Sequence, residues 1–335
     1  MVWVMNVLLL SCHGVLEYDE LRMWSEIPGL TIMSPGAYWE PHRGTDFRPP
    51  LSFTFPREWK EAWDRIPITP EQPDHKYHIT EEAVEPFDVI VVMHHWPWIF
   101  DNWEVLKGKT VVWRDIGQTT PQEEVDLVKK VKDLGVKIVR YWDGYQSRKG
   151  YQGHDAIIPF GKYKEDFPVW QGSRQAVLGL CQSIEQRSEE CRYECWNTST
   201  QELSRVMLGG GNDGLPSWGG NKSYPELLHS LMTHRSMWYG GTRPAPYTLG
   251  LMEAMFTGIP IFTVRQPGWE TAVTDLLRDY NLADSSTELR GKIAASLVTS
   301  RTLLGTVAQD QRRTAIECWD ASVIKPKWEA FFKSL

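Results

Sequence analysis

Continuous apolar runs alternate with amphipathic segments along the first 160 residues of the chain. The apolar runs, each read as a strand, lie at residues 4–11, 88–93, 110–113, 137–142 and 156–160, with a shorter one at 30–33. Segments with helical spacing of apolar positions lie between them, at residues 17–27, 101–106 and 121–135. Strands that are apolar throughout are buried on both faces, as in a parallel sheet covered by helices. The pattern predicts a Rossmann-like α/β domain over residues 1–162.

A second alternating series follows a polar, Pro- and Gly-containing linker at residues 161–175. It predicts strands at 176–182, 236–241 and 259–264, helices at 194–204, 223–232 and 247–258, and a glycine-rich turn at 207–214. The tail from residue 287 has helical spacing, with Trp319, Trp328, Phe331 and Phe332 as large apolar anchors. We therefore expect a second Rossmann-like domain over residues 175–310. The Pro- and aromatic-rich stretch 34–66 fits no regular element.

Composition limits the possible functions. The chain has 335 residues, 24% of them charged, and a net charge of −7, so binding to nucleic acid would need a local basic patch. Five cysteines, an odd and sparse set, indicate reduced thiols and a cytoplasmic protein. The apolar opening is too short to span a bilayer, so we expect no transmembrane anchor. The 17 tryptophans favour ligands with flat faces, such as sugars or bases.

The candidate site with the clearest chemistry follows the predicted strand at 236–241. Gly240 and Gly241 allow the backbone to approach a phosphate, and Arg243 supplies a cation. Tyr247 and Thr248 stand at the start of the next helix, where N–H groups and the helix dipole favour anions. Glu253 lies about one turn into that helix, and its carboxylate can accept two hydroxyl groups, such as those of a ribose.

The stretch "LGLMEAMFTGIPIFTV", residues 249–264, resembles the donor-site signature of retaining GT-B glycosyltransferases, glycosyltransferase family 4 in particular. The resemblance implies a GT-B fold, in which two Rossmann-like domains face each other across a cleft and a C-terminal helix, here 311–335, returns to the first domain. It gives Glu253 the role of binding the ribose of a nucleotide-sugar. The signature has a second glutamate eight residues earlier, where this chain has Ala245.

Two further elements extend the resemblance. The family clamps the donor diphosphate with an arginine and a lysine after a strand, and Gln182 and Arg187 occupy those places. Arginine is a competent phosphate ligand, whereas glutamine brings no charge. The segment "VVMHHWPW" is similar to an "HDW" element of related synthases, which assigns His94 or His95 to catalysis at the cleft between the domains.

Other candidates lie at the ends of predicted strands in the first domain. His13 and Gly14 follow the first strand, where GT-B proteins keep a loop near the donor phosphates or the acceptor. Asp115 could serve an acceptor hydroxyl or cap the next turn.

Each candidate also has a structural alternative. Glu253 could be a solvated helix residue, the two histidines could be packing residues, and Arg187 could be a surface cation. The glycine-rich turn could bind a phosphate or a base, or could be only flexible.

The implied reaction is metal-independent transfer of a hexosyl or pentosyl group with retention, from a UDP- or GDP-sugar and without a cofactor. The alternatives are a catalytically inactive GT-B module that binds nucleotide-sugars, favoured by Ala245 and Gln182, and an epimerase or phosphorylase of the same fold.

The acceptor is tied to the insert at residues 34–76 of the first domain. Arg43, Arg48, Arg57, Lys60 and Arg65 alternate there with aromatic residues, a composition typical of surfaces that bind polyanions. We therefore expect Arg43, Arg48, Trp39 and Trp96 to contact the acceptor. One possible acceptor is a 5-hydroxymethylated pyrimidine in DNA, as for viral DNA-modifying GT-B enzymes in a host cytoplasm; the others are a glycan, a lipid or a small molecule.

Overall fold

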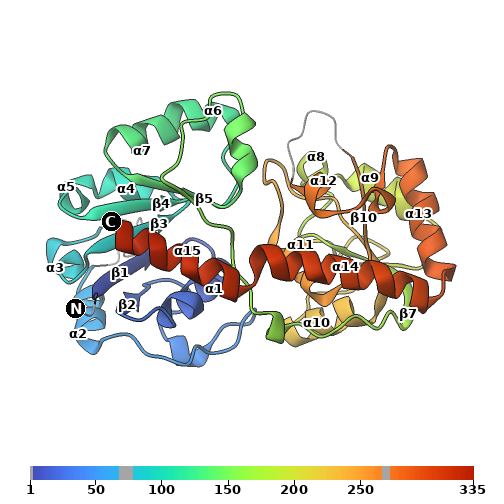
Figure 1. The fold of residues 1–335 in the computed structure, drawn as a ribbon, viewed down its shortest axis with the longest axis horizontal. Helices are drawn as coiled ribbons and strands as arrows, with labels where there is room; N and C mark the ends of the chain where they lie inside the picture. Colours follow the sequence, from blue (N-terminus) through green and yellow to red (C-terminus); the bar gives the residue numbers. More distant parts are fainter. Residues whose placement is uncertain (1–2, 68–77, 266–271) are drawn as a thin grey trace. The chain divides into compact units, whose positions relative to one another are not determined.

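The computed structural model describes residues 3–67, 78–265 and 272–335, so residues 68–76 of the insert lie outside the described part. The chain forms two compact units, each with its own sheet and core (Figure 1). Unit 1 comprises residues 1–162 and 321–335, and unit 2 comprises residues 163–320.

The sheet of unit 1 is parallel throughout, as predicted, with strand order β2-β1-β3-β4-β5-β6. Its strands are β1 (Met5–Leu10), β2 (Leu30–Met33), β3 (Val89–Met93), β4 (Thr110–Arg114), β5 (Lys137–Arg140) and β6 (Ala156–Ile157). Every residue of β3 is buried, which explains its uninterrupted apolar sequence. The chain runs from β1 outward to β2 and then returns to β3 on the other side, so the strand order reverses between β1 and β3. Ligands of open α/β sheets bind at the carboxyl ends of strands at such a reversal.

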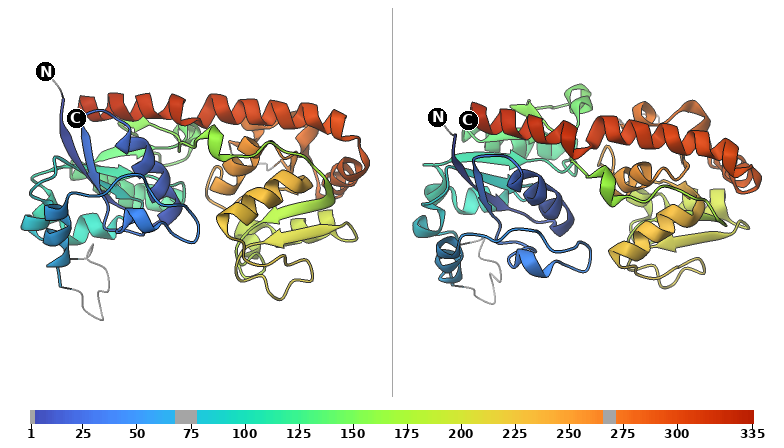
Figure 2. Two further views of the ribbon diagram at one scale, coloured as in Figure 1. Left: turned by 90° about the horizontal axis from the view of Figure 1, so that it is seen from below. Right: turned by 60° about the horizontal axis from the view of Figure 1, so that its bottom comes forward.

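Helices cover this sheet on both faces. They are α1 (Gly14–Ser25), α2 (Arg57–Asp64), α3 (Glu81–Val84), α4 (Pro97–Asp101), α5 (Trp103–Leu106), α6 (Pro121–Glu123), a π-helical turn (Glu124–Val128), α7 (Lys129–Asp133) and α15 (Ala321–Ser334). Two 3₁₀ turns lie at Pro41–Arg43 and Asp143–Ser147. In α15, Trp328 packs edge-on against Trp24 of α1, with ring centroids 5.0 Å apart, so the end of the chain belongs to the core of unit 1 (Figure 2).

Helix α2 corrects the expectation that residues 34–66 hold no regular element. Trp59, Ala62 and Trp63 recur at helical spacing and are buried, and the ring of Trp59 lies 4.7 Å from that of Phe87. This apolar stripe stabilises a helix inside a segment whose prolines and exposed polar residues hide it.

Unit 2 has a second parallel sheet, with strand order β11-β10-β9-β7-β8. Its strands are β7 (Arg174–Leu180), β8 (Arg205–Leu208), β9 (His234–Trp238), β10 (Ile261–Val264) and β11 (Leu282–Ala283). Strands β8 and β11 were not predicted from the sequence. The strand order reverses between β7 and β9, and this reversal places the loops after these two strands side by side at one edge of the sheet.

The helices of unit 2 are α8 (Ser188–Cys191), α9 (Tyr193–Thr200), α10 (Tyr224–Thr233), α11 (Leu249–Thr257), α12 (Val273–Leu276), α13 (Ser286–Val298) and α14 (Arg301–Trp319), with 3₁₀ turns at Lys164–Asp166 and Asp279–Asn281. Helix α14 packs against α11, and Arg312 on α14 donates hydrogen bonds to the carbonyl oxygens of Phe256 and Phe167. The helical tail predicted from residue 287 is confirmed.

Candidate functional site

The loop after β9 in unit 2 has a tightly constrained backbone. A Cβ atom on Gly240 would lie 2.3 Å from the ring of Trp238 and 2.7 Å from the carbonyl oxygen of Cys191. Gly241 has φ +74°, a conformation that side chains disfavour. The Arg243 N–H donates to the carbonyl of Glu190 at 3.0 Å, and the following peptide bond, to Pro244, is cis. Both glycines are therefore required for the path of the loop itself.

Helix α11 begins at the end of this loop with a capped N-terminus. The Thr248 hydroxyl accepts a hydrogen bond from the Leu251 N–H at 3.4 Å, and the Tyr239 hydroxyl also contacts Thr248. Burial raises the pKa of Tyr239 to about 12, so its phenol stays protonated. Tyr247 is buried, with its ring 5.1 Å from that of Trp319. The side chains of Tyr247 and Thr248 are thus structural, and what they offer an anion is backbone N–H groups at the helix start.

Glu253 lies on the second turn of α11 and is only 4% exposed. Its backbone carbonyl accepts a hydrogen bond from the Thr257 hydroxyl at 2.9 Å. This burial contradicts the alternative that Glu253 is a solvated helix residue. Ala245, at the place of the missing signature glutamate, is buried and brings no carboxylate to the loop.

Arg192 is a cation that the sequence analysis did not identify. It adopts the left-handed conformation, with φ +64°, at the start of α9. Burial lowers the pKa of Arg192 to about 10; Cys195 partly offsets this effect, and the positive charge of Arg243 lowers the pKa further. Arg192 and Arg243 are therefore close enough to repel each other, and an anion bound between them would relieve that repulsion.

The loop after β7 adds Arg187 and a pair of thiols. Arg187 stands at the N-terminus of α8, and its charge acts on the thiols of Cys181 and Cys191, which hydrogen-bond to each other. This bond and Arg187 lower the pKa of Cys191 to about 6. Gln182 is exposed at the start of the loop. The fold of unit 2 thus gathers the loops after β7 and β9 and the start of α11, which carry the predicted donor-site residues of this unit, at the edge where the strand order reverses.

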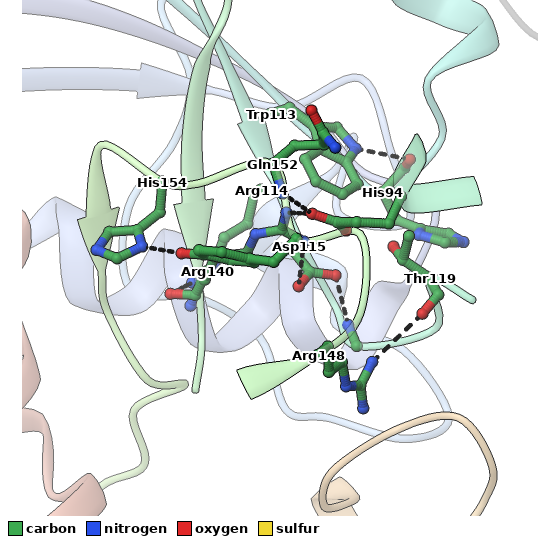
Figure 3. A network of polar contacts seen from close by, with 12 residues as sticks. His94, Trp113, Arg114, Asp115, Thr119, Arg140, Arg148, Gln152 and His154 are labelled. Atoms are coloured by element: carbon green, nitrogen blue, oxygen red, sulfur yellow. Dashed lines mark hydrogen bonds and ion pairs between the residues drawn. The ribbon is translucent and has the colours of Figure 1, made fainter. Parts of the chain in front are cut away.

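In unit 1, His94 occupies the corresponding position after β3. It has φ +60°, its N–H donates to Arg114 O at 2.9 Å, and its carbonyl accepts from Trp113 Nε1 at 2.9 Å (Figure 3). Its ring stands edge-on to Trp96 at 5.2 Å, and its Nδ1 is buried without a hydrogen-bond partner among the described residues. Burial lowers the pKa of His94, so the ring is neutral at pH 7. A strained strand-end histidine with an unused ring nitrogen is typical of a functional residue.

His95 differs from His94 in its packing. Its N–H donates to the carbonyl of Met93 at 2.7 Å, and its ring lies 4.5 Å from that of Trp98. The structural alternative, a packing histidine, accounts for this residue. The sequence did not distinguish His94 from His95 as the catalytic candidate, and the geometry favours His94.

His13 and Gly14 form the start of α1. His13 is its N-cap, with Nδ1 accepting from the Leu16 N–H at 3.4 Å, and a Cβ atom on Gly14 would meet the Cβ of Ala37 at 3.0 Å. The neighbouring Cys12 thiol donates to the carbonyl of Met93 at 3.3 Å, so the loops after β1 and β3 touch.

The pKa of His13 predicts a pH dependence of stability. Burial lowers this pKa, so as the pH falls below about 6.5 the unfolded chain takes up a proton that the folded chain resists, and the free energy of unfolding falls. His13→Asn keeps an N-cap without titrating. We expect urea denaturation between pH 7.5 and 5.5 to show a smaller loss of stability for His13→Asn than for the wild type; equal losses would contradict this role. Burial raises the pKa of Glu20 to about 7, so protonation of Glu20 makes the free energy of unfolding rise as the pH falls. This contribution is the same in the wild type and in His13→Asn.

Asp115 is part of a buried ion network rather than an open site. Its side chain is 0% exposed; one carboxylate oxygen accepts from the Gly117 N–H at 2.7 Å, and the other lies 3.4 Å from Arg140 (Figure 3). Arg140 also pairs with Glu124. The alternative that Asp115 caps the next turn accounts for these contacts, and we leave it out of the proposed catalytic residues.

The described part of the insert, residues 34–67, does not have the cationic surface that its arginines indicated. Residues 34–66 contain five Arg or Lys and also five Asp or Glu. Lys60 lies 4.8 Å above the ring of Trp39 and pairs with Glu40, while Arg57 pairs with Glu61 and Arg65 with Glu82. Arg48 is only 5% exposed, whereas Arg43 is exposed. The expectation of a local positive patch was wrong, because the acidic residues of the same segment neutralise it.

Among the described residues, no cluster of three or more His, Cys, Asp or Glu side chains could hold a metal ion. Within the same residues, none of the helices is both long and apolar enough to cross a membrane.

No protein-family model and no curated protein sequence matches the chain. Solved structures of the same fold do match over nearly its whole length. Anabaena Alr3699/HepE, in complex with UDP-glucose, is 12% identical with a TM-score of 0.71, covering 99% of this chain and 100% of that one. Sucrose-phosphate synthase from Thermosynechococcus elongatus is 10% identical with a TM-score of 0.67, covering 98% of both chains. A glycosyltransferase from Rickettsia africae is 9% identical with a TM-score of 0.65, covering 99% of this chain and 98% of that one.

These likenesses do not single out glycosyltransferase family 4 or a DNA-modifying enzyme. What they do establish, together with the two parallel sheets, is that the chain has the GT-B fold of two Rossmann-like domains.

Proposed function

We propose that this protein is a glycosyltransferase that transfers a sugar from a UDP-sugar to an acceptor hydroxyl. The observation that carries the proposal is the set of groups around the β7/β9 reversal of unit 2. Arg187 and Arg192 stand at the two ends of α8 in the segment after β7, and Arg243 lies in the loop that leads from β9 to α11. Glu253 is buried on the second turn of α11. Cations and a helix N-terminus suit a diphosphate, and a carboxylate suits the two hydroxyls of a ribose.

Uridine as the donor base is supported by the solved relatives of this fold. HepE has been solved with UDP, with UDP and glucose, and with UDP-glucose. The charges of unit 2 do not distinguish UDP from GDP, so the first measurement is the affinity for nucleoside diphosphates that differ in their base.

The proposed chemistry needs charge stabilisation more than acid–base catalysis by unit 2. As the sugar–phosphate bond breaks, negative charge grows on the departing UDP, and the three guanidiniums together with the α11 N–H groups stabilise it. Fixed cations of this kind can supply the stabilisation that a divalent ion supplies elsewhere, so we propose metal-independent transfer. Retention of stereochemistry is what the resemblance of residues 249–264 to retaining GT-B glycosyltransferases implies. His94 of unit 1, neutral at pH 7, orients the sugar or accepts a hydrogen bond from it.

We propose that unit 1 supplies the acceptor site. The balanced charge of the insert favours an acceptor without a dense run of phosphates, such as a glycan or a small molecule, over DNA. Arg43 and the half-buried Trp39 and Trp96 remain candidates to contact it.

Glu253→Gln tests the donor site. Losing a charge-assisted hydrogen bond removes about 1.5 to 3 kcal/mol, so the Kd for UDP should rise roughly 10- to 150-fold. Calorimetry with UDP, GDP and ADP measures it. In thermal unfolding, a ligand at 100 times its Kd stabilises the wild type by about 2.7 kcal/mol. Glu317→Gln, at an exposed position of α14, is the matched control and should bind UDP as the wild type does.

Two results would count against the proposal. If no nucleoside diphosphate binds the wild type, unit 2 is not a donor site. If UDP binds but no UDP-sugar is hydrolysed or transferred, the protein is the inactive binding module that Ala245 and Gln182 favour.

A further inference from the structure

Trp218 is the one tryptophan among the described residues whose side chain is exposed, with 38% of its surface accessible. It lies in the segment 209–221, between β8 and α10. A single exposed aromatic residue is ordinary on a protein surface. Trp218 is informative because hydrogen bonds fix its backbone and its indole, and because its segment is joined to the loop after β7.

The backbone around Trp218 pairs with β8. Met207 donates to the carbonyl of Ser217 at 2.8 Å, and Gly219 donates to the carbonyl of Met207 at 2.8 Å. The indole Nε1 of Trp218 in turn donates to the carbonyl of Gly209 at 3.1 Å. With its backbone and its N–H both bonded, the exposed ring has little freedom to lose when a ligand packs on it.

The segment that carries Trp218 is joined to the loop after β7. Asn212 is buried, and its side chain donates to Cys181 O at 2.6 Å and accepts from the Ile184 N–H at 2.9 Å. Gly209 has φ +127°, and a Cβ atom there would lie 2.2 Å from Cys181 O. The loops after β7 and β8 therefore form one connected layer at the carboxyl ends of the strands.

The sheet order sets the distance between Trp218 and the cations of the proposed donor site. Strands β9, β7 and β8 are successive neighbours. Neighbouring strands are about 4.8 Å apart, so the end of β8 lies roughly 10 Å from the loop after β9. The Trp218 backbone pairs with Met207 on the outer side of β8, but its indole reaches back to the carbonyl of Gly209 at the end of that strand. That separation suits a nucleoside diphosphate, with its phosphates between Arg192 and Arg243 and its flat base displaced toward β8.

We propose that Trp218 is the platform on which the nucleobase of the donor stacks. The inference rests on the proposed donor site of unit 2 and adds to it the residue that binds the aromatic ring. A π-face stacks on any base, so Trp218 strengthens binding of nucleotides over phosphates without choosing among bases.

The test compares Trp218→Ala and Trp218→Phe with the wild type, using UDP and inorganic pyrophosphate as ligands in calorimetry. We expect Trp218→Ala to weaken UDP binding roughly tenfold or more, Trp218→Phe to retain most of the affinity, and pyrophosphate binding to stay within about twofold in both variants. The uracil H5 and H6 resonances should shift upfield on binding to the wild type and not to Trp218→Ala.

Three results would overturn the inference. Unchanged UDP affinity in Trp218→Ala, with Glu253→Gln still impaired, would leave the donor site standing without a stacking platform. An equal loss of UDP and pyrophosphate binding would mean that Trp218 only maintains the loop. A wild type that binds pyrophosphate but not UDP, or neither ligand, would reject the proposed donor site as well.

Discussion

Replacing His94 by asparagine should lower the rate of UDP-sugar hydrolysis by roughly 100- to 1,000-fold, the range for loss of one positioned hydrogen-bonding group that stabilises a transition state, while the Kd for UDP stays unchanged. His94 is on unit 1, and the groups proposed to bind UDP are on unit 2. Asparagine tolerates the left-handed backbone, with φ +60°, so the variant should fold. The rate is measured with the UDP-sugar that the wild type hydrolyses fastest, in the absence of acceptor.

His95→Asn is the matched control, because it makes the same chemical change one residue away. His95 packs on Trp98, and its loss should leave the rate within a few-fold of the wild type. The pH profile gives a second readout. Burial lowers the pKa of His94, so the wild-type rate should persist on the acid side of pH 6.5, where a solvated histidine would already be charged. Equal rates for His94→Asn and the wild type would mean that His94 has no catalytic role and that its left-handed backbone is only a structural feature.

The elements that could be predicted from the sequence are those in which every residue of a continuous segment is buried. Strand β3 is buried along its whole length, so its sequence is apolar without interruption. Strand β8 has four residues, of which two are only half-buried, and it runs directly into glycines; β11 has two residues. Such short edge strands carry too few apolar positions to produce a pattern, and only their pairing with a neighbour defines them.

The candidate site divides in the same way. Glu253 was found because the loop, helix and strand that surround it are contiguous in sequence. Arg192 was missed because its significance arises from its electrostatic interaction with Arg243, which exists only in the folded chain. The charge of the insert was misjudged because its cations were counted without the carboxylates that pair with them.

Asp115 shows a different limit. Any residue at the end of a strand lies where either catalysis or capping is possible, and the sequence gives no basis for choosing. The informative signal was in another strand, because the buried Arg140 ends β5 directly after the apolar Ile138 and Val139. A charge inside a buried strand needs a partner, and the parallel pairing of β4 with β5 brings Asp115 to it.

Arg140→Met should lower the free energy of unfolding of unit 1 by about 3 to 5 kcal/mol and its Tm by roughly 10 °C. Arg140 is 0% exposed, pairs with Asp115 and Glu124, and lies over the rings of Trp113 and Tyr145. Burial opposes its charge, and the two carboxylates more than offset this, so the pKa of Arg140 is raised. Methionine fills the space but leaves both carboxylates buried without their cation, and that uncompensated charge is the source of the loss.

The companion variants decide between a structural and a catalytic Asp115. Combining Arg140→Met with Asp115→Asn and Glu124→Gln removes all three charges, and it should recover a large part of the stability lost by Arg140→Met alone. UDP binding, measured as the Kd, should be unchanged in every variant, because these residues belong to unit 1. Asp115→Asn alone should lower stability and activity together. If Asp115→Asn instead abolished sugar transfer at wild-type stability, Asp115 would be acting on the acceptor. The ion pair with Arg140 would then hold the Asp115 carboxylate in position for that role.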